Sequence, residues 1–322
     1  MRNLFARTAP QGTCRAFTLV ELLISVVVLT IIIFMVAQLM SSATAITRTG
    51  NKHIDTDAEA RTVFDRLAVD FGKMLKRSDI DYWLKQQGAR YYPGHSAGHS
   101  NGKGHTKATT QQGSDQIAFY SQVPGYYPST ISQSPISLVA YRVNTTTYQL
   151  ERMGKGLLWN GVPGSNTPMV FLPLTIDQTW AAATGTGADT NYETIGPDVF
   201  RFEYYYLLKN GQVTDNPWDT DATLTPPHTS INGLKDVQAI AVAIAVIDPQ
   251  SRSLLSLQNL IDLEANMIDF RNAPSKNGNA NKKTGDLEYQ WGQAVTANTA
   301  SVPPAACQAI RIYSRFFNLN LP

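Results

Sequence analysis

One apolar run, Leu22–Ala37, limits most strongly what this chain can become. Its 16 residues carry no charge, and only Ser25 and Thr30 are mildly polar. Counted from Phe17 to Met40, the stretch has 24 residues, which at about 1.5 Å per residue gives about 36 Å of helix. That length crosses a hydrocarbon layer about 30 Å thick with some tilt. The sequence therefore predicts a transmembrane helix near the N-terminus.

The residues before this run indicate which way the chain crosses the membrane. Arg2, Arg7 and Arg15 precede it, and no acidic residue does. An excess of basic residues keeps a flank on the cytoplasmic side. We therefore expect a single-pass protein of the inner membrane with a cytoplasmic N-terminus, and we expect everything after Ser41 to be exported, with the head in the periplasm.

Glu21 is unusual for a plain membrane anchor. It lies within the apolar stretch, where an ionised side chain costs a few kcal/mol and normally has a partner. The sequence around it reads AFTLVELLIS, with the small residue Ala16 directly before Phe17. Glu21 is thus the fifth residue when Phe17 is counted as the first.

This run resembles the processing site of type IV prepilins and type II secretion pseudopilins. The resemblance implies that a prepilin peptidase cuts between Ala16 and Phe17 and methylates the new amine of Phe17. It also implies that Glu21 neutralises the amine of a neighbouring subunit, since such pairing removes an unpaired charge from lipid. The family usually has glycine where this chain has alanine, which is also small.

Two other interpretations of the N-terminus stay open. Ala43-Thr44-Ala45 fits a signal-peptidase site of the A-x-A kind, and cleavage there would leave Ile46 as the first residue. The second interpretation is a plain membrane anchor in which Glu21 has no role. The apolar run is at or beyond the upper end of the roughly 7–15 residues usual for a signal peptide, and a discarded segment gives Glu21 no purpose.

Beyond the membrane, apolar residues continue at helical spacing on a polar background. No proline lies between Phe17 and Leu75, so we predict one long helix over residues 17–77 that follows a leader of residues 1–16. A head of residues 78–322 completes the chain. The apolar positions beyond the membrane are Ile54, Ala58, Ala60, Phe64, Leu67, Phe71 and Leu75.

The end of this helix carries a second pattern. We expect Phe64, Leu67 and Phe71 to form the stripe that docks the helix on a sheet. Residues 61–75, with Leu67 and Asp70 in a Leu-x-x-Asp pattern, also resemble the helix end of J-type minor pseudopilins.

The rest of the chain is dominated by strand signals, namely β-branched and aromatic runs between turn residues. Val237–Ile247 reads as buried on both faces, Asn144 and Asn210-Gly211 mark hairpin turns, and one later helix is expected over Ser253–Asp269. An α+β fold with a long helix packed on a mainly antiparallel sheet follows. The predicted strands are Gln116–Ser121, Ser137–Asn144, Thr147–Met153, Val199–Leu208, Asp236–Asp248 and Cys307–Leu319.

Three stretches of the head strengthen the resemblance. They are GSDQIAFYS at Gly113–Ser121, LVAYRVNTTTYQLER at Leu138–Arg152 and DVFRFEYYYL at Asp198–Leu207. They resemble the J-type order of a Tyr-containing strand, a Leu-x-Arg strand and a later aromatic strand. The nearest resemblance is to the Verru_Chthon cassette protein C family, which is pilin-like.

Two polar segments are candidates for metal binding. Asp215, Asp219 and Asp221 lie within seven residues, and carboxylate oxygens at such spacing can hold calcium, although the Gly and the distal Glu of an EF-hand are missing. A solvated turn is the alternative there. The histidines at 95, 99 and 105 sit among glycines without a Cys or carboxylate, so we interpret them as part of a polar loop.

Composition and motifs exclude several classes of protein. The chain has 322 residues, a formal charge of +2 and 43% apolar residues, which argues against disorder and against nucleic-acid binding. Two cysteines, Cys14 and Cys307, make no disulfide framework. No nucleophile elbow, P-loop, dinucleotide fingerprint or HExxH stands in a usable context, and we therefore expect no enzymatic activity. Three adjacent tyrosines, Tyr204–Tyr206, must alternate faces and are expected in the core.

The expected function follows from these features and from the resemblance. We expect a structural subunit, minor or at the tip because of its bulky head, of a type IV pilus-like or type II secretion pseudopilus fibre. Its partners would be other pilin-like subunits, a prepilin peptidase and the inner membrane, and no cofactor is needed. The alternative is a membrane-tethered or secreted binding module, for calcium, glycan or DNA, that forms no fibre.

Overall fold

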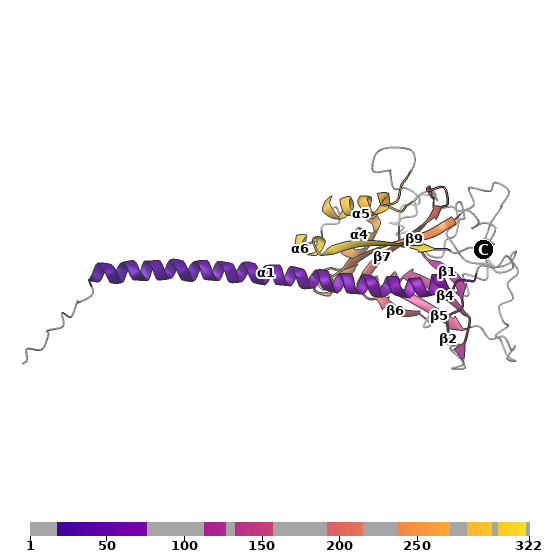
Figure 1. The fold of residues 1–322 in the computed structure, drawn as a ribbon, viewed down its shortest axis with the longest axis horizontal. Helices are drawn as coiled ribbons and strands as arrows, with labels where there is room; N and C mark the ends of the chain where they lie inside the picture. Colours follow the sequence, from indigo (N-terminus) through magenta and orange to yellow (C-terminus); the bar gives the residue numbers. More distant parts are fainter. Residues whose placement is uncertain are drawn as a thin grey trace, which may run out of the picture. The chain divides into compact units, whose positions relative to one another are not determined.

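The computed structural model of the protein describes residues 18–75, 113–126, 133–156, 192–214, 237–270, 282–297 and 302–319. The chain forms two compact units, of which the first ends at Asn51 and the second begins at Lys52. One helix, α1, runs from Leu19 to Gly72 without a break (Figure 1). The predicted long helix is therefore confirmed, although it ends at Gly72 and not at residue 77.

The first part of α1 is strongly apolar. Among the residues that the structure describes, α1 alone is long and apolar enough for a membrane span or a signal sequence. Its hydroxyl residues bond to the helix itself, since Ser25 and Thr30 donate to the carbonyls of Glu21 and Val26, both at 2.7 Å. The hydroxyl groups of Ser25 and Thr30 are therefore hydrogen-bonded even where the surroundings are apolar.

The second unit contains two sheets. The first has the order β1-β4-β5-β2-β3, and β6 pairs with β5. Its pairings are antiparallel except that of β2 with β5, which is parallel. Its strands are β1 (Ile117–Ser121), β2 (Gly125–Tyr126), β3 (Gln133–Ser134), β4 (Ser137–Val143), β5 (Leu150–Gly156) and β6 (Tyr192–Gly196).

The second sheet is antiparallel throughout and has the order β10-β9-β7-β8. Strand β9 is buried along its length except at Gln238, as its continuous apolar sequence predicts. Tyr204, Tyr205 and Tyr206 on β7 are each 1% exposed or less, which confirms their place in the core. The strands are β7 (Val199–Leu208), β8 (Val213–Thr214), β9 (Val237–Ile247) and β10 (Ile310–Asn318).

Both predicted hairpin turns are present. Asn144 closes the β4–β5 turn by accepting the N–H groups of Thr146 and Thr147 at 2.8 and 3.2 Å, as an Asx turn does. In the β7–β8 turn Gly211 has a φ of 82°, in the left-handed region that glycine enters without steric cost. The sequence signals and the local geometry agree at both positions.

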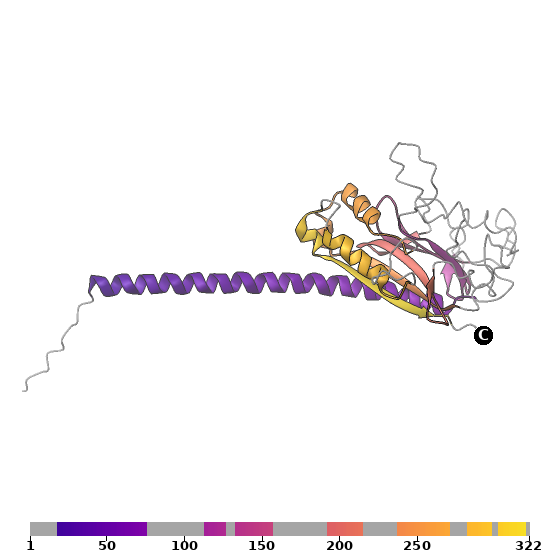
Figure 2. The ribbon, with the colours of Figure 1, turned by 90° about the horizontal axis from the view of Figure 1, so that it is seen from above.

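The later helices differ from the sequence prediction. The helix expected over Ser253–Asp269 is α4, which covers only Leu257–Asn266 because Ser256 caps its N-terminus by accepting from Asn259 N–H. A short helix, α3 (Pro249–Arg252), precedes it. Two further helices were not predicted, α5 (Asp286–Ala297) and α6 (Pro304–Cys307). Figure 2 shows α5 lying along β10, both in yellow.

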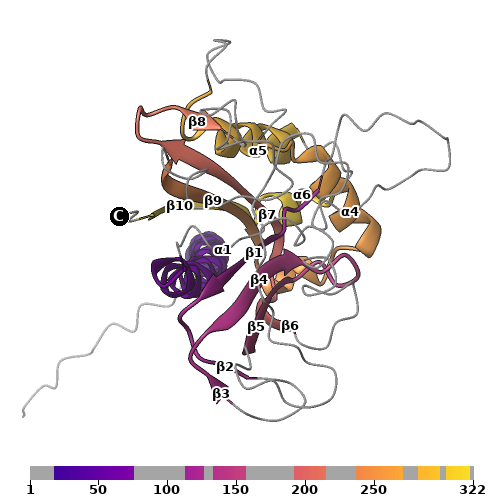
Figure 3. The same ribbon diagram turned by 90° about the vertical axis from the view of Figure 1, so that its right-hand side faces the viewer.

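Within the second unit, α1 packs between the edges of the two sheets. The ring of Phe71 stacks on Phe119 of β1 with centroids 4.9 Å apart and contacts Phe317 of β10 at 5.2 Å. Phe64 and Leu67 are also buried, so the predicted docking stripe is confirmed. Figure 3 shows α1 end-on beside β1 and β10.

Candidate assembly helix and its anchor in the head

The N-terminal part of α1 exposes an apolar surface on every side. From Leu19 to Met40 the large apolar side chains are between 49% and 80% exposed. A helix that is apolar all round is stable only in lipid or among other helices. The surface of Leu19–Met40 is therefore suited to lipid or to packing with other helices.

Glu21 has a partner in its own chain. Its Oε2 accepts from the backbone N–H and from the hydroxyl of Thr18, both at 3.0 Å. In return the N–H of Glu21 donates to the Thr18 hydroxyl at 3.3 Å. This reciprocal pattern is a capping box, with Thr18 as the N-cap and Glu21 three residues later. The negative charge also lies at the positive end of the helix dipole, which favours it.

Other sequence candidates fall outside the described residues. These are the two residues of the expected cleavage site, Ala16 and Phe17, and the calcium candidates Asp215, Asp219 and Asp221. The segment with the histidines at 95, 99 and 105 lies outside them as well. Within the residues that the structure describes, no group of three or more His, Cys, Asp or Glu could hold a metal ion.

Asp70 anchors α1 in the head. Its carboxylate is fully buried and accepts from Nε and Nη2 of Arg152 on β5 at 2.7 and 3.1 Å. The hydroxyl of Tyr141 on β4 donates to the same carboxylate. Burial, and then the charge of Asp70, raise the pKa of Tyr141 well above its usual range, so the phenol stays a donor. Arg66 lies one helical turn away, with its Nε 3.7 Å from Asp70.

Backbone contacts complete this anchor. The Ser121 hydroxyl on β1 donates to the carbonyl of Asp70 at 2.9 Å. Just beyond the helix, Leu75 N–H donates to Tyr120 O at 2.8 Å and Gln122 N–H to Lys73 O at 2.9 Å. Both strands of the β1–β4 pair therefore bind the end of α1, which fixes its position and its rotation on the first sheet.

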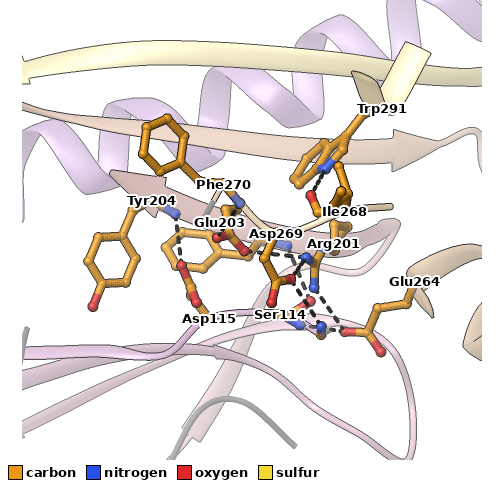
Figure 4. A network of polar contacts seen from close by, with 12 residues as sticks. Ser114, Asp115, Arg201, Glu203, Tyr204, Glu264, Ile268, Asp269, Phe270 and Trp291 are labelled. Carbon is orange, nitrogen blue, oxygen red and sulfur yellow. Dashed lines mark hydrogen bonds and ion pairs between the residues drawn. The ribbon is translucent and has the colours of Figure 1, made fainter. Parts of the chain in front are cut away.

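A second buried charge cluster lies on the other sheet, around Arg201 of β7 (Figure 4). Its Nη2 donates to Asp269 at 2.5 Å and to Glu203 at 3.3 Å, and its Nη1 lies 3.8 Å from Glu264. These carboxylates raise the pKa of Arg201 although burial opposes its charge. The guanidinium also lies 5.4 Å from the ring of Trp291 on α5.

The carboxylates of this cluster each bind a backbone N–H of another segment. Glu264 accepts from Ser114 at 2.7 Å, Asp269 from Gly113 at 3.3 Å, and Glu203 from Phe270 at 3.1 Å. Figure 4 shows Ser114, Glu264 and Asp269 gathered around Arg201. The cluster joins the segment before β1, the strand β7 and the segment after α4, so its evident role is to hold these segments together.

Sequence reasoning missed the Arg201 cluster and the capping box. The box was readable, because Thr18-x-x-Glu21 is its sequence signature. For the cluster the one available signal was a pair of charges, Arg201 and Glu203, on the same face of an otherwise aromatic strand. Comparison of the chain with protein-family models, with curated proteins and with solved structures gives no match.

Proposed function

We propose that this chain is a non-enzymatic, pilin-like subunit that is cleaved before Phe17 by a prepilin peptidase. It assembles through α1 into a type IV pilus-like or type II secretion pseudopilus fibre. The observation that carries this proposal is the exposed apolar surface of Leu19–Met40, which contains a single carboxylate, Glu21. Before assembly lipid covers this surface, and in the fibre other pilin-like subunits cover it.

The capping box of Thr18 and Glu21 is compatible both with the subunit in the membrane and with the subunit in the fibre. Cleavage before Phe17 keeps Thr18 and Glu21 together, so the helix cap survives processing. Only one oxygen of Glu21, Oε2, accepts from Thr18. A carboxylate has room for further donors on its other oxygen, and the methylated amine of a neighbouring subunit is the donor that we propose.

The buried anchor supports a mechanical role for the head. A subunit drawn out of the membrane through its helix transmits force to its head through their contacts. The Asp70–Arg152 pair and the aromatic contacts of Phe71 provide such a connection, because a doubly hydrogen-bonded buried pair has a defined geometry. The large head suggests a minor or tip-located subunit.

Two substitutions of Glu21 separate assembly from helix capping. Glu21→Gln removes the charge but keeps a capping side chain, since glutamine also serves in a capping box, whereas Glu21→Ala removes both. If Glu21 pairs with a neighbouring amine, both variants insert in the membrane but lose cross-linking to other pilin-like subunits. If the residue only caps the helix, Glu21→Gln cross-links like the wild type, and the proposed pairing of Glu21 with a neighbouring amine is wrong.

A second candidate function is a membrane-tethered or secreted binding module. The same helix α1 is long and apolar enough to serve as a signal sequence or as a plain anchor. In either case Glu21→Ala leaves the interactions of the head unchanged, and no cross-linked series of subunits forms in the wild type. The cross-linking measurement therefore distinguishes the two functions.

A further inference from the structure

The segment of α1 that begins the second unit meets the turn between β6 and β7. Glu59 is half-buried, and its Oε1 accepts the backbone N–H of Asp198 at 2.8 Å. The two carboxyl groups also lie close enough for each to affect the pKa of the other. Asp198 is 7% exposed. Two carboxyl groups thus share one poorly hydrated site at a helix-to-head contact.

The other charged groups around this pair come from two further elements. Arg252 of α3 has its Nε 3.8 Å from Asp198, and its Nη2 donates to the carbonyls of Thr147 and Tyr148, both at 2.7 Å. Asp248, which directly follows β9, caps α3 by accepting from the N–H groups of Gln250 and Ser251. Lys52 lies about two turns before Glu59 on α1. Its Nζ is 3.6 Å from Asp248 Oδ2 and donates to the Ser251 hydroxyl at 2.9 Å.

The charges of this group do not balance when every acid is ionised. Glu59, Asp198 and Asp248 are three carboxylates, and Lys52 and Arg252 are two cations, so one negative charge is left over in a partly buried site. Like charges at one site favour retention of a proton by one of them. Burial, and then the proximity of Asp198, raise the pKa of Glu59 to about 7, and burial raises the pKa of Asp198.

We propose that Glu59 and Asp198 share one proton and act as a pH-dependent latch between α1 and the β6–β7 turn. With the proton in place, the carboxyl of Glu59 donates to the carboxylate of Asp198. When the proton leaves, two carboxylates face each other and the contact between Lys52–Glu59 and the head loosens. The change requires only the release of this proton and no bound metal or partner. It does not depend on the proposed fibre function.

The sign of the pH dependence follows from linkage. A carboxyl group whose pKa is raised in the folded state stabilises that state at low pH, and this contribution is lost as pH rises through the folded-state pKa. For Glu59 the loss begins near the unfolded-state pKa of about 4.3 and is complete a little above the folded-state pKa of about 7. A domain in the periplasm is exposed directly to changes in the pH of the surroundings.

Hydrogen exchange of the purified full-length protein in detergent tests the latch. We expect amides of Lys52–Glu59 to open about ten-fold more often at about pH 8 than at about pH 6, after correction for intrinsic exchange, since one unit of pKa linkage corresponds to a factor of about ten. Glu59→Gln can still accept the N–H of Asp198 and can donate to its carboxylate, and it does not ionise. It should retain the low-pH protection at both pH values.

Asp55→Asn is the matched control, because Asp55 is an exposed acid one turn earlier on the same helix, and it should keep the wild-type response. Histidines also change charge in this range, and His53 contacts Arg311 nearby. The decisive quantity is therefore the difference between wild type and Glu59→Gln. An equal pH response in these two proteins overturns the proposal, as does a wild type without any response.

A direct titration covers the case in which the variant folds poorly. Infrared difference spectra of the wild type should show the band of a protonated carboxyl group disappearing around pH 7. A spectrum in which every carboxyl group is already ionised by about pH 5.5 contradicts the shared proton.

Discussion

Asp70 on α1 and Arg152 on β5 form a two-point ion pair, with N–O distances of 2.7 and 3.1 Å and side-chain exposures of 0% and 3%. The two residues are 82 positions apart. Because they belong to different elements of the second unit, the pair fixes how the helix sits on the first sheet. Tyr141 of β4 and Ser121 of β1 add two further buried hydrogen bonds to the same residue of α1.

Removing the carboxylate of Asp70 should therefore destabilise the head strongly. Asp70→Ala leaves the guanidinium of Arg152 buried without its main partner, and loss of one member of a buried pair costs about 3–5 kcal/mol. The free energy of unfolding, measured by urea denaturation of the full-length protein in detergent, should fall by about that amount.

Asp65 provides the matched control on the same helix. It pairs with Arg315 at 2.7 Å, but the two side chains are 61% and 43% exposed. Exposed pairs contribute about 0–1 kcal/mol, so Asp65→Ala should change the free energy of unfolding little. Equal losses for Asp65→Ala and Asp70→Ala would show that burial of the Asp70 pair is not what stabilises the helix contact.

The Arg201 cluster leads to a local prediction. Asp269→Asn removes a negative charge that Arg201 needs and weakens the acceptor of Gly113 N–H. We expect a loss of about 2–4 kcal/mol in the free energy of unfolding and faster hydrogen exchange at Gly113 and Ser114. Asp262→Asn, at a less buried acid on α4 that accepts from Gln258, should change neither quantity. Unchanged exchange in Asp269→Asn would contradict the role assigned to the cluster.

Cys307 should be unreactive in the folded protein. The residue is 7% exposed, and burial raises the pKa of its thiol, which lowers the fraction of thiolate at a given pH. A thiol reagent at about pH 8 should label Cys307 slowly in native protein and rapidly in urea. The proposed cleavage before Phe17 would remove Cys14 and leave Cys307 as the one thiol of the mature protein. Rapid labelling of native mature protein would contradict the burial.

The strands could be predicted because their signals are local. Val199–Leu208 was predicted with its observed bounds, and β9 within one residue at each end, since β-branched and aromatic runs between turns are typical of strands. The capping box at Thr18 and Glu21 was equally local. Helix α5 was missed because Asp286–Ala297 follows a polar stretch rich in Gly and Asn and has a weak apolar period. Its buried apolar side chains are Leu287 and Trp291.

The contacts between distant residues could not be predicted in the same way. The resemblance at Leu67 and Asp70 and the Leu-x-Arg strand ending at Arg152 were both noted in the sequence, yet nothing local indicates that Asp70 and Arg152 meet. Their pairing depends on where the helix docks between the sheets, which is a property of the whole core. The same holds for Glu59 and Asp198, which lie 139 residues apart.

The mature N-terminus tests the central claim most directly. Mass spectrometry of protein purified from the membrane of a cell that has a prepilin peptidase should find N-methylated Phe17 as the first residue. Removal of residues 1–16 then takes three arginines and no acid, which leaves 24 basic and 25 acidic residues. A mature protein that begins at Ile46, or one that keeps Met1–Ala16, would contradict processing as a pilin-like subunit.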